Sequence, residues 1–155
     1  MSLAREVEAA DEFLVGLVGA FGFDATVRQG DIDDEIQELA VSGDDLGLLI
    51  GPKGSTLEAV QELTRLAARR QVEGRAEARI RVDVSGYRER RRAALERFVR
   101  SLAEEVRASG SQKALEPMTS PDRKVVHDTV AELDGVATLS EGEEPNRRVV
   151  IIPEA

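Results

Sequence analysis

The sequence predicts an α+β protein built from two small α/β sandwich domains, each a small sheet packed by helices. Two observations lead to this prediction. Stretches with apolar residues every three or four positions alternate with short stretches in which every second residue is apolar, and this order occurs in both halves of the 155 residues. The composition, 41% hydrophobic and 33% charged, is that of a globular protein. Because only 3% of residues are aromatic, we expect cores of Val, Leu, Ile and Ala.

The first predicted domain covers residues 1–84. It opens with an amphipathic helix that ends near Gly22, because apolar residues recur at helical spacing up to that glycine. The expected elements that follow are strands at 24–28 and 35–42, a short helix at 45–50 and a strand at 78–84. Between the first two strands, the segment QGDIDD (residues 29–34) is rich in turn-forming residues, so we expect a turn there.

Between residue 50 and the last of these strands, a second amphipathic helix is predicted. Leu57, Val60, Leu63 and Ala67 form its expected buried stripe. Ser55 or Thr56 is the expected N-cap, since a hydroxyl oxygen can accept a hydrogen bond from the first turn.

The second predicted domain covers residues 85–155. A long helix, expected to bury Leu95, Phe98, Leu102 and Val106, ends near Gly110. The next helix begins at Ser120, the expected N-cap, with a proline in its first turn. An extended segment at 113–117 precedes that helix, and a strand pair at 136–139 and 147–152 closes the domain around the acidic loop SEGEEPN.

Charge is segregated along the chain. The net charge is −9, yet residues 47–100 carry thirteen basic and seven acidic side chains between two acidic flanks. Arginines on a helix are most often simply solvated. Their clustering beside a glycine-rich loop favours the alternative, an electrostatic footprint for a polyanion.

That loop lies in the stretch GLLIGPKGST (residues 47–56), and we call residues 51–54 the GPKG loop. A Walker nucleotide-binding loop is excluded because its lysine follows the second glycine, whereas Lys53 precedes Gly54. A GxxG turn between two helices suits a nucleic-acid backbone, since glycines allow close approach and the next helix offers its N-terminal amides. The candidate backbone contacts are Gly51, Pro52, Lys53, Gly54 and Ser55.

Four stretches together resemble one known family, the bacterial Jag proteins, also called SpoIIIJ-associated or KhpB proteins. They are GLLIGPKGSTLEAVQELTRLAARR, IRVDVSGYRERRRAALE, LEPMTSPDRKVVHDTV and SEGEEPNRRVVIIP, and they cover nearly the whole chain. The resemblance implies a type II KH domain over residues 1–84 and an R-three-H domain over residues 85–155. It also implies a link to RNA chaperoning or post-transcriptional regulation in cell elongation and cell shape. Larger relatives carry a further N-terminal domain.

The R-three-H pattern falls on Arg123 and His127, which lie on one face of the predicted helix because they are four residues apart. By itself, the histidine fits an ordinary surface or half-buried position. An arginine in a first helical turn opposes the helix dipole, at a cost of roughly 0.3–1 kcal/mol that a bound phosphate would reverse. The resemblance implies that this pair binds the backbone of single-stranded nucleic acid.

Further candidate contacts are less specific. Of Arg147 and Arg148, one is expected to pair with the carboxylates of the EGEE segment, which leaves at most one for a ligand. Arg91 and Arg92 belong to a cluster that gathers near the domain junction, and we expect part of it to face RNA.

Several function classes are disfavoured by what the sequence lacks. It has one histidine, no cysteine, and none of the common hydrolase or metalloprotease motifs, so we expect no enzyme, no cofactor and no metal site. No apolar stretch is long enough to enter a membrane and no secretory signal is recognised, which predicts a cytoplasmic protein.

The leading hypothesis is a non-catalytic protein that binds single-stranded RNA, or alternatively single-stranded DNA. Because aromatic residues that could stack on bases are few, affinity should depend on phosphates and on salt. The resemblance adds a small single-KH protein as a partner, and a homodimer is a further candidate. The alternative hypothesis is a protein-interaction adaptor that uses a degenerate KH surface.

Overall fold

The computed structural model describes residues 2–33, 35–72 and 78–155. The chain divides into two compact units, Met1–Arg88 (unit 1) and Glu89–Ala155 (unit 2), and each is described by itself. Each contains one three-stranded sheet and helices, which confirms the predicted α+β class. Within the described residues, no helix has both the length and the apolar character needed to cross a membrane.

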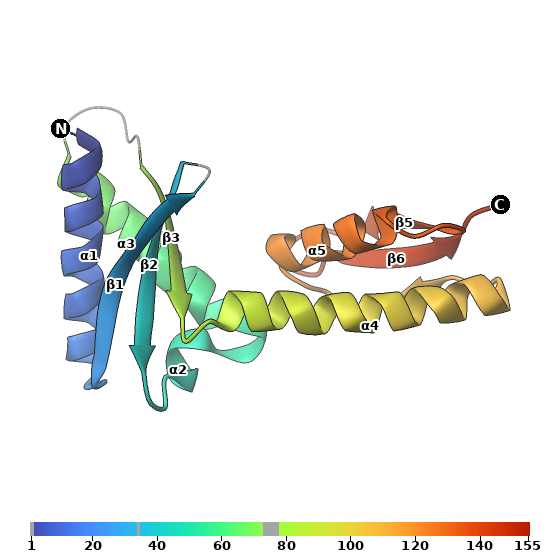
Figure 1. Ribbon diagram of the computed structural model, residues 1–155, viewed down its shortest axis with the longest axis horizontal. Coiled ribbons are helices and arrows are strands. Elements are labelled where there is room, and N and C mark those ends of the chain that lie inside the picture. The colour runs from blue at the N-terminus through green and yellow to red at the C-terminus, as the bar shows by residue number, and fades with distance from the viewer. Residues whose placement is uncertain (1, 34, 73–77) are drawn as a thin grey trace. The chain divides into compact units, whose positions relative to one another are not determined.

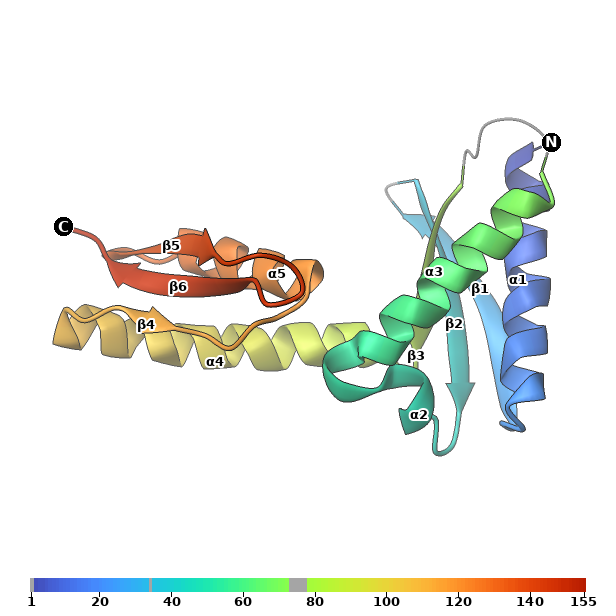
Figure 2. The same ribbon diagram turned by 180° about the vertical axis from the view of Figure 1, so that it is seen from behind.

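Unit 1 is a sheet with two long helices on one face, as Figures 1 and 2 show. The strand order is β1-β2-β3; β1 is antiparallel to β2, and β3 is parallel to β2. A parallel pair needs a crossover, and α2, the short 3₁₀ turn η1 and α3 provide it. The elements are α1 (Ser2–Ala20), β1 (Ala25–Asp33), β2 (Ile36–Gly43), α2 (Gly47–Ile50), η1 (Pro52–Gly54), α3 (Ser55–Arg70) and β3 (Arg79–Val84).

The hairpin of unit 1 differs from the prediction. The turn expected over residues 29–34 is mostly strand, because β1 continues to Asp33; Asp34 lies outside the described residues. The pairing of β1 with β2 shifts register between Gln29 and Ile32, the mark of a β-bulge. The side-chain amide of Gln37 donates to the carbonyl of Gly30 at 2.6 Å. The turn-forming residues therefore produce a β-bulge within β1 and do not end the strand.

The buried face of α3 is also rotated relative to the predicted stripe. Leu57 and Val60 are buried as expected, but Thr64 and Ala68 continue the stripe, whereas Leu63 is 50% exposed. Thr64 can be buried because its hydroxyl donates to the carbonyl of Val60 at 2.7 Å, which satisfies the polar group. The core joins α1 and α3 to the alternating buried positions of β2 and β3.

Unit 2 packs two helices and a small antiparallel sheet around a second core. The sheet order is β4-β6-β5, and in Figure 2 β4 follows β6 along one edge. Val99 is fully buried, while Phe98, expected inside, is 56% exposed, again because the helix faces its core one position away from the predicted stripe. The elements are α4 (Tyr87–Ser109), whose first two residues belong to unit 1, β4 (Lys113–Ala114), α5 (Ser120–Ala131), β5 (Val136–Glu141) and β6 (Arg148–Pro153).

The start of α5 is one residue earlier than predicted. Thr119, not Ser120, is the N-cap, and its hydroxyl oxygen accepts a hydrogen bond from the amide of Asp122 at 3.4 Å. Pro121 lies in the first turn as expected, where a missing amide hydrogen costs nothing. The cap fixes where α5 begins, and with it the positions of Arg123 and His127.

Candidate nucleic-acid interface

The GPKG loop joins α2 to α3, and its backbone requires both glycines. Gly51 has φ +71° and Gly54 has φ +77°, in the region that favours glycine. A Cβ atom on Gly51 would lie 2.2 Å from the hydroxyl oxygen of Thr56, and one on Gly54 would lie 2.8 Å from a ring carbon of Tyr87. The sharp bend between the two helices therefore excludes any side chain at either position.

The tip of the loop faces solvent. Pro52, Lys53 and Ser55 are exposed, and Lys53 has φ +53°, so its backbone takes the left-handed conformation that completes the turn. Gly54, not Ser55 or Thr56, is the N-cap of α3, and no side chain caps that helix end. The hydroxyl cap predicted from the sequence is thus wrong. The amides of Gly54 and Ser55 donate to the carbonyls of Gly51 and Pro52, so it is the positive end of the α3 dipole that favours an anion here.

Behind the loop, Arg88 holds the first turns of α3 against β3. Its guanidinium donates to the carbonyl of Val82 at 2.8 Å, to Glu58 at 3.0 Å and to Gln61 at 2.9 Å. The helical pattern alone predicts an outward face for Arg88. No local pattern reveals its actual role, since its partners on α3 lie about 30 residues earlier in the chain. Tyr87 therefore packs against Gly54, and Arg88 joins the first two turns of α3 to β3.

In unit 2, Arg123 is held inside the domain. Its side chain is only 10% exposed; one guanidinium nitrogen donates to the carbonyl of Met118 at 2.8 Å, and another forms an ion pair with Glu144. His127 is half-buried, and its Nδ1 lies 2.6 Å from the hydroxyl oxygen of Thr138 on β5. Both side chains thus point toward the sheet side of α5, where each already has a partner within the domain.

The additional arginine candidates in unit 2 are also paired. Arg148 contacts Glu141 through Nε at 2.8 Å and Nη2 at 2.6 Å, as expected for one of the two arginines before the last strand. Arg147 donates instead to the backbone carbonyl of Gly142 at 2.8 Å. The structure therefore brings Arg123, Arg147 and Arg148 together around the loop that joins β5 to β6.

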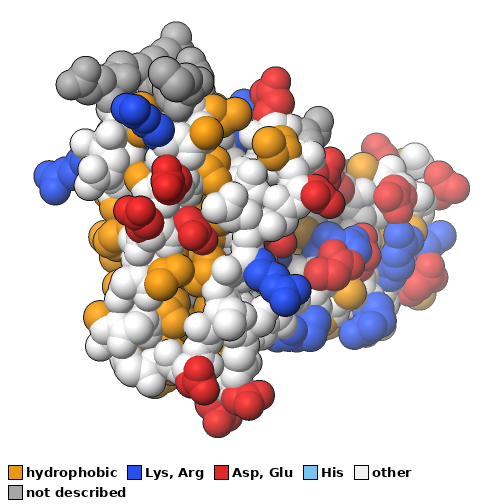
Figure 3. Space-filling model, turned by 60° about the vertical axis from the view of Figure 1, so that its left-hand side comes forward, with side chains coloured by type: hydrophobic (Ala, Val, Ile, Leu, Met, Phe, Trp, Pro, Cys, Tyr) orange, Lys and Arg blue, Asp and Glu red, His pale blue; other side chains and the backbone are white. Residues whose placement is uncertain are grey.

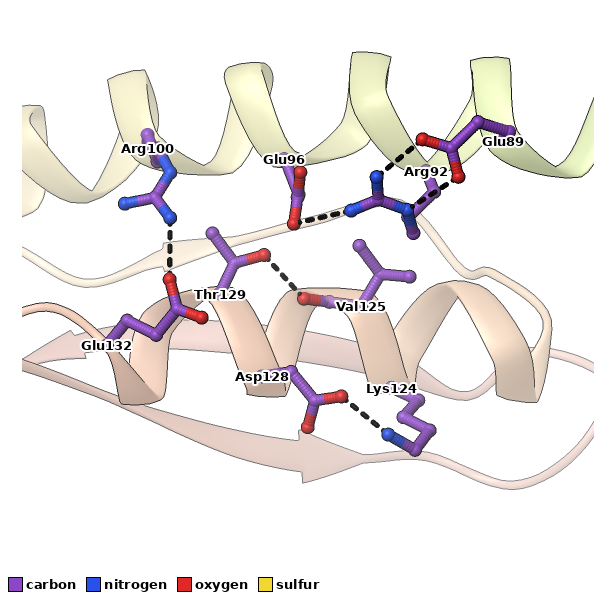
Figure 4. A network of polar contacts seen from close by, with 9 residues as sticks. All are labelled: Glu89, Arg92, Glu96, Arg100, Lys124, Val125, Asp128, Thr129 and Glu132. Atoms are coloured by element: carbon purple, nitrogen blue, oxygen red, sulfur yellow. Dashed lines mark hydrogen bonds and ion pairs between the residues drawn. The ribbon is translucent and has the colours of Figure 1, made fainter. Parts of the chain in front are cut away.

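On α4, Arg91 donates to Asp122 through Nε at 3.2 Å and Nη2 at 3.0 Å, which links α4 to the start of α5. Arg92 lies between Glu89 and Glu96, at 2.6 Å and 2.9 Å, as Figure 4 shows. The hydrogen bond from Arg92 lowers the pKa of the Glu89 carboxyl below its usual value. Both carboxylate partners of Arg92 therefore lie on its own helix, α4.

Pairing with carboxylates recurs among the described arginines of the basic segment. On the face drawn in Figure 3, several Lys and Arg side chains lie next to Asp and Glu side chains. The solvated interpretation therefore holds for exposed helix arginines such as Arg65 and Arg100, whose carboxylate partners are exposed as well. The pairs include Arg65 with Glu62, Arg81 with Glu38, Arg88 with Glu58, and Arg100 with Glu132.

Among the described residues, no group of three or more His, Asp or Glu side chains could hold a metal ion. The described part of the chain thus offers two regions for an anion, the GPKG loop of unit 1 and the arginine cluster around the β5–β6 loop of unit 2. In unit 1 the region combines the positive end of the α3 dipole with the exposed side chain of Lys53. In unit 2 the donors are guanidinium groups that have carboxylate or carbonyl partners.

Comparison with known proteins identifies the family of the chain. Residues 93–153 match the family model of the R-three-H domain. The chain is 37% identical over 145 residues to the RNA-binding protein KhpB of Lactiplantibacillus plantarum, covering 94% of this chain and 44% of the relative. It is 33% identical over 146 residues to the protein of the same name from Clostridium symbiosum, covering 93% and 64%. The chain spans about half the length of the curated relatives it matches. Its second unit contains an R-three-H domain, and the chain belongs to the KhpB (Jag) family.

Proposed function

We propose that the chain binds single-stranded RNA, without catalysis, through two contacts: the GPKG loop of unit 1 and the arginine cluster of its R-three-H domain. In this proposal unit 1 is a type II KH domain. Its element order and the names of the relatives, which are RNA-binding proteins, support the assignment. A role in post-transcriptional regulation or RNA chaperoning tied to cell shape follows from the family resemblance and belongs to the same proposal.

The observation that carries the proposal is the turn between α2 and α3. Gly51 and Gly54, both with positive φ, make a sharp bend whose tip, Pro52 and Lys53, is exposed, so a sugar-phosphate strand can reach it. The uncapped start of α3 favours an anion at this place, and Lys53 adds a charged donor at the tip. GxxG loops of KH domains clamp about four nucleotides in this way.

In the R-three-H domain, a second stretch of the same strand would meet Arg123 and His127 on α5. Arg147 and Arg148 are the nearest further donors, and Arg91 and Arg92 extend the region along α4. Because few aromatic residues are present for stacking, each contact alone is weak, and linking the two raises the apparent affinity.

The test uses fluorescence anisotropy with a short labelled single-stranded RNA, and with DNA of the same sequence as a second probe. Lys53→Asp should lower affinity about tenfold or more, because a charge-assisted contact is lost and a repulsive charge is added. The double variant Pro52→Asp, Lys53→Asp should lower it further. The matched control is Lys113→Asp, an equal charge reversal at an exposed position whose partner is Glu105.

Equal losses in the Lys53 and Lys113 variants would mean that net charge, not the loop, governs binding. Raising the salt concentration should weaken binding of the original chain steeply. The slope of log affinity against log salt should become shallower by about 0.7 when one phosphate contact is removed.

The alternative of a protein-interaction adaptor is favoured by a groove of about 710 Å³ between α1 and α3. Its floor is apolar, and Leu63 and Leu66 are exposed there. If that surface binds a protein through apolar contacts, association should survive high salt, whereas RNA binding should not. Replacing Leu63 with Asp separates the two, since it should abolish a protein contact and leave RNA binding intact.

A further inference from the structure

The ion pair between Arg123 and Glu144 joins two side chains with very different surroundings. The side chain of Arg123 is 10% exposed, whereas that of Glu144 is 61% exposed. The buried guanidinium is anchored on one side by the carbonyl of Met118, so it stays in place. The carboxylate approaches it from the solvent side and can turn away into water.

We propose that the carboxylate of Glu144 occupies the position at which Arg123 would receive a phosphate, and that RNA enters the R-three-H domain by displacing it. The inference rests on the proposed function, since it assumes that Arg123 is a phosphate contact. In addition, the carboxylate of Glu144 competes with phosphate for Arg123, so a phosphate can bind only after it has displaced this carboxylate.

The chemistry of the two anions supports such an exchange. A guanidinium presents its donors in a planar fork that fits a carboxylate and a phosphate equally well. A mostly buried guanidinium without an anion is costly, because its charge is then neither hydrated nor paired. Arg123 therefore needs one anion or the other, and only the partner on the solvent side can be exchanged.

Other carboxylates do not fill this place. Asp122, the neighbour of Arg123 in sequence, is engaged by Arg91. Glu141, in the same loop as Glu144, is paired with Arg148. Among the ion pairs of the described residues, Glu144 is thus the carboxylate that neutralises Arg123.

The turn that carries Glu144 is held in place, so the exchange requires movement of one side chain rather than of the loop. The amide of Asn146 donates to the carbonyl of Glu143 at 2.8 Å, and Arg147 donates to the carbonyl of Gly142 at 2.8 Å.

The experiment compares Glu144→Gln with Glu143→Gln in the full chain. Both remove one negative charge from adjacent exposed positions, but only Glu144 contacts Arg123. Glu144→Gln should raise affinity for a short single-stranded RNA by about threefold to tenfold, as expected when a competing ion pair of modest strength is lost. Glu143→Gln should raise it by less than twofold, roughly the effect of one screened charge. In an Arg123→Gln background, the gain from Glu144→Gln should vanish.

A second readout uses inorganic phosphate and the NMR signals of the Arg123 side chain. These signals should shift at lower phosphate concentrations in Glu144→Gln than in the original chain, and Glu144→Ala should serve in its place if the glutamine variant does not fold. Equal effects of the two glutamine variants, or a gain that persists without Arg123, would overturn the inference. If phosphate titrates Arg123 as described but no variant binds RNA, the competitor is supported and the proposed function fails.

Discussion

Replacing Gly54 with alanine is the sharpest perturbation of the GPKG loop. Gly54 has φ +77°, which costs a residue with a Cβ atom roughly 1–2 kcal/mol. The new Cβ would lie 2.8 Å from a ring carbon of Tyr87. That is roughly 0.7 Å short of the optimal separation of about 3.5 Å, and overpacking of this kind costs about 1–3 kcal/mol.

Alanine also has fewer backbone conformations than glycine in the unfolded chain, and this raises the free energy of unfolding by about 0.4–1 kcal/mol. The expected net loss in the free energy of unfolding is therefore about 2–4 kcal/mol. The same change displaces Tyr87 from the loop, so RNA binding should fall together with stability.

The measurement is urea denaturation followed by tyrosine fluorescence. The chain has one tyrosine and no tryptophan, so the signal comes from Tyr87 alone and reports on unit 1. A local probe is needed because a chain with two units need not unfold in a single transition.

The matched control is Gly47→Ala in α2, where no atom lies within 4 Å of the new Cβ and φ is not positive. That variant should be neutral or more stable by up to about 1 kcal/mol, as alanine favours a helix. Equal unfolding midpoints for the two variants would refute the argument from backbone conformation and ring contact.

Three further outcomes follow from the packing and the charges. Leu39→Ala, in the core of unit 1, should lower the free energy of unfolding by about 2–5 kcal/mol, whereas the exposed Leu63→Ala should change it by no more than about 0.5 kcal/mol, both measured by denaturation. Gly51→Ala should lower the free energy of unfolding at least as much as Gly54→Ala does, because its Cβ would lie only 2.2 Å from the hydroxyl oxygen of Thr56. In an NMR pH titration, the Glu89 carboxyl should titrate below its ordinary pKa, and Arg92→Gln should return the midpoint upward. Because that pKa is lowered on folding, the pair stabilises the native state above the ordinary pKa and ceases to do so as pH falls through the lowered one.

Much of the fold could be predicted from the sequence because periodicity is a local property. The order of long helices and strands follows from spacings of two and of three or four residues, which need no knowledge of distant partners. The buried faces of α3 and α4 could not be predicted to the residue from this periodicity. Thr64 and Val99 are buried, whereas Leu63 and Phe98 were expected to be. The difference of one position depends on where the sheet lies against each helix, and a helix of mixed apolar residues fits either orientation.

The candidate site shows the same division. The turn at Gly51 and Gly54 could be predicted from the chain alone, since two glycines between helical segments allow the positive φ that a sharp bend needs. Two contacts could not be predicted from the chain alone: that of Tyr87 with Gly54, and the ion pair of Arg123 with Glu144. These contacts join residues 21 to 33 positions apart, and nothing in the local pattern selects one carboxylate or ring among many.

Sequence alone thus determined the α+β class, the glycine turn and the family to which the chain belongs. Only the tertiary structure decided which charges are available. It placed several arginines of the basic segment beside carboxylates and left the tip of the GPKG loop at the surface, next to a helix start without a side-chain cap. The residue type fixes the charge of a side chain. Whether that charge is neutralised depends on which distant side chain the fold brings within a few ångströms of it.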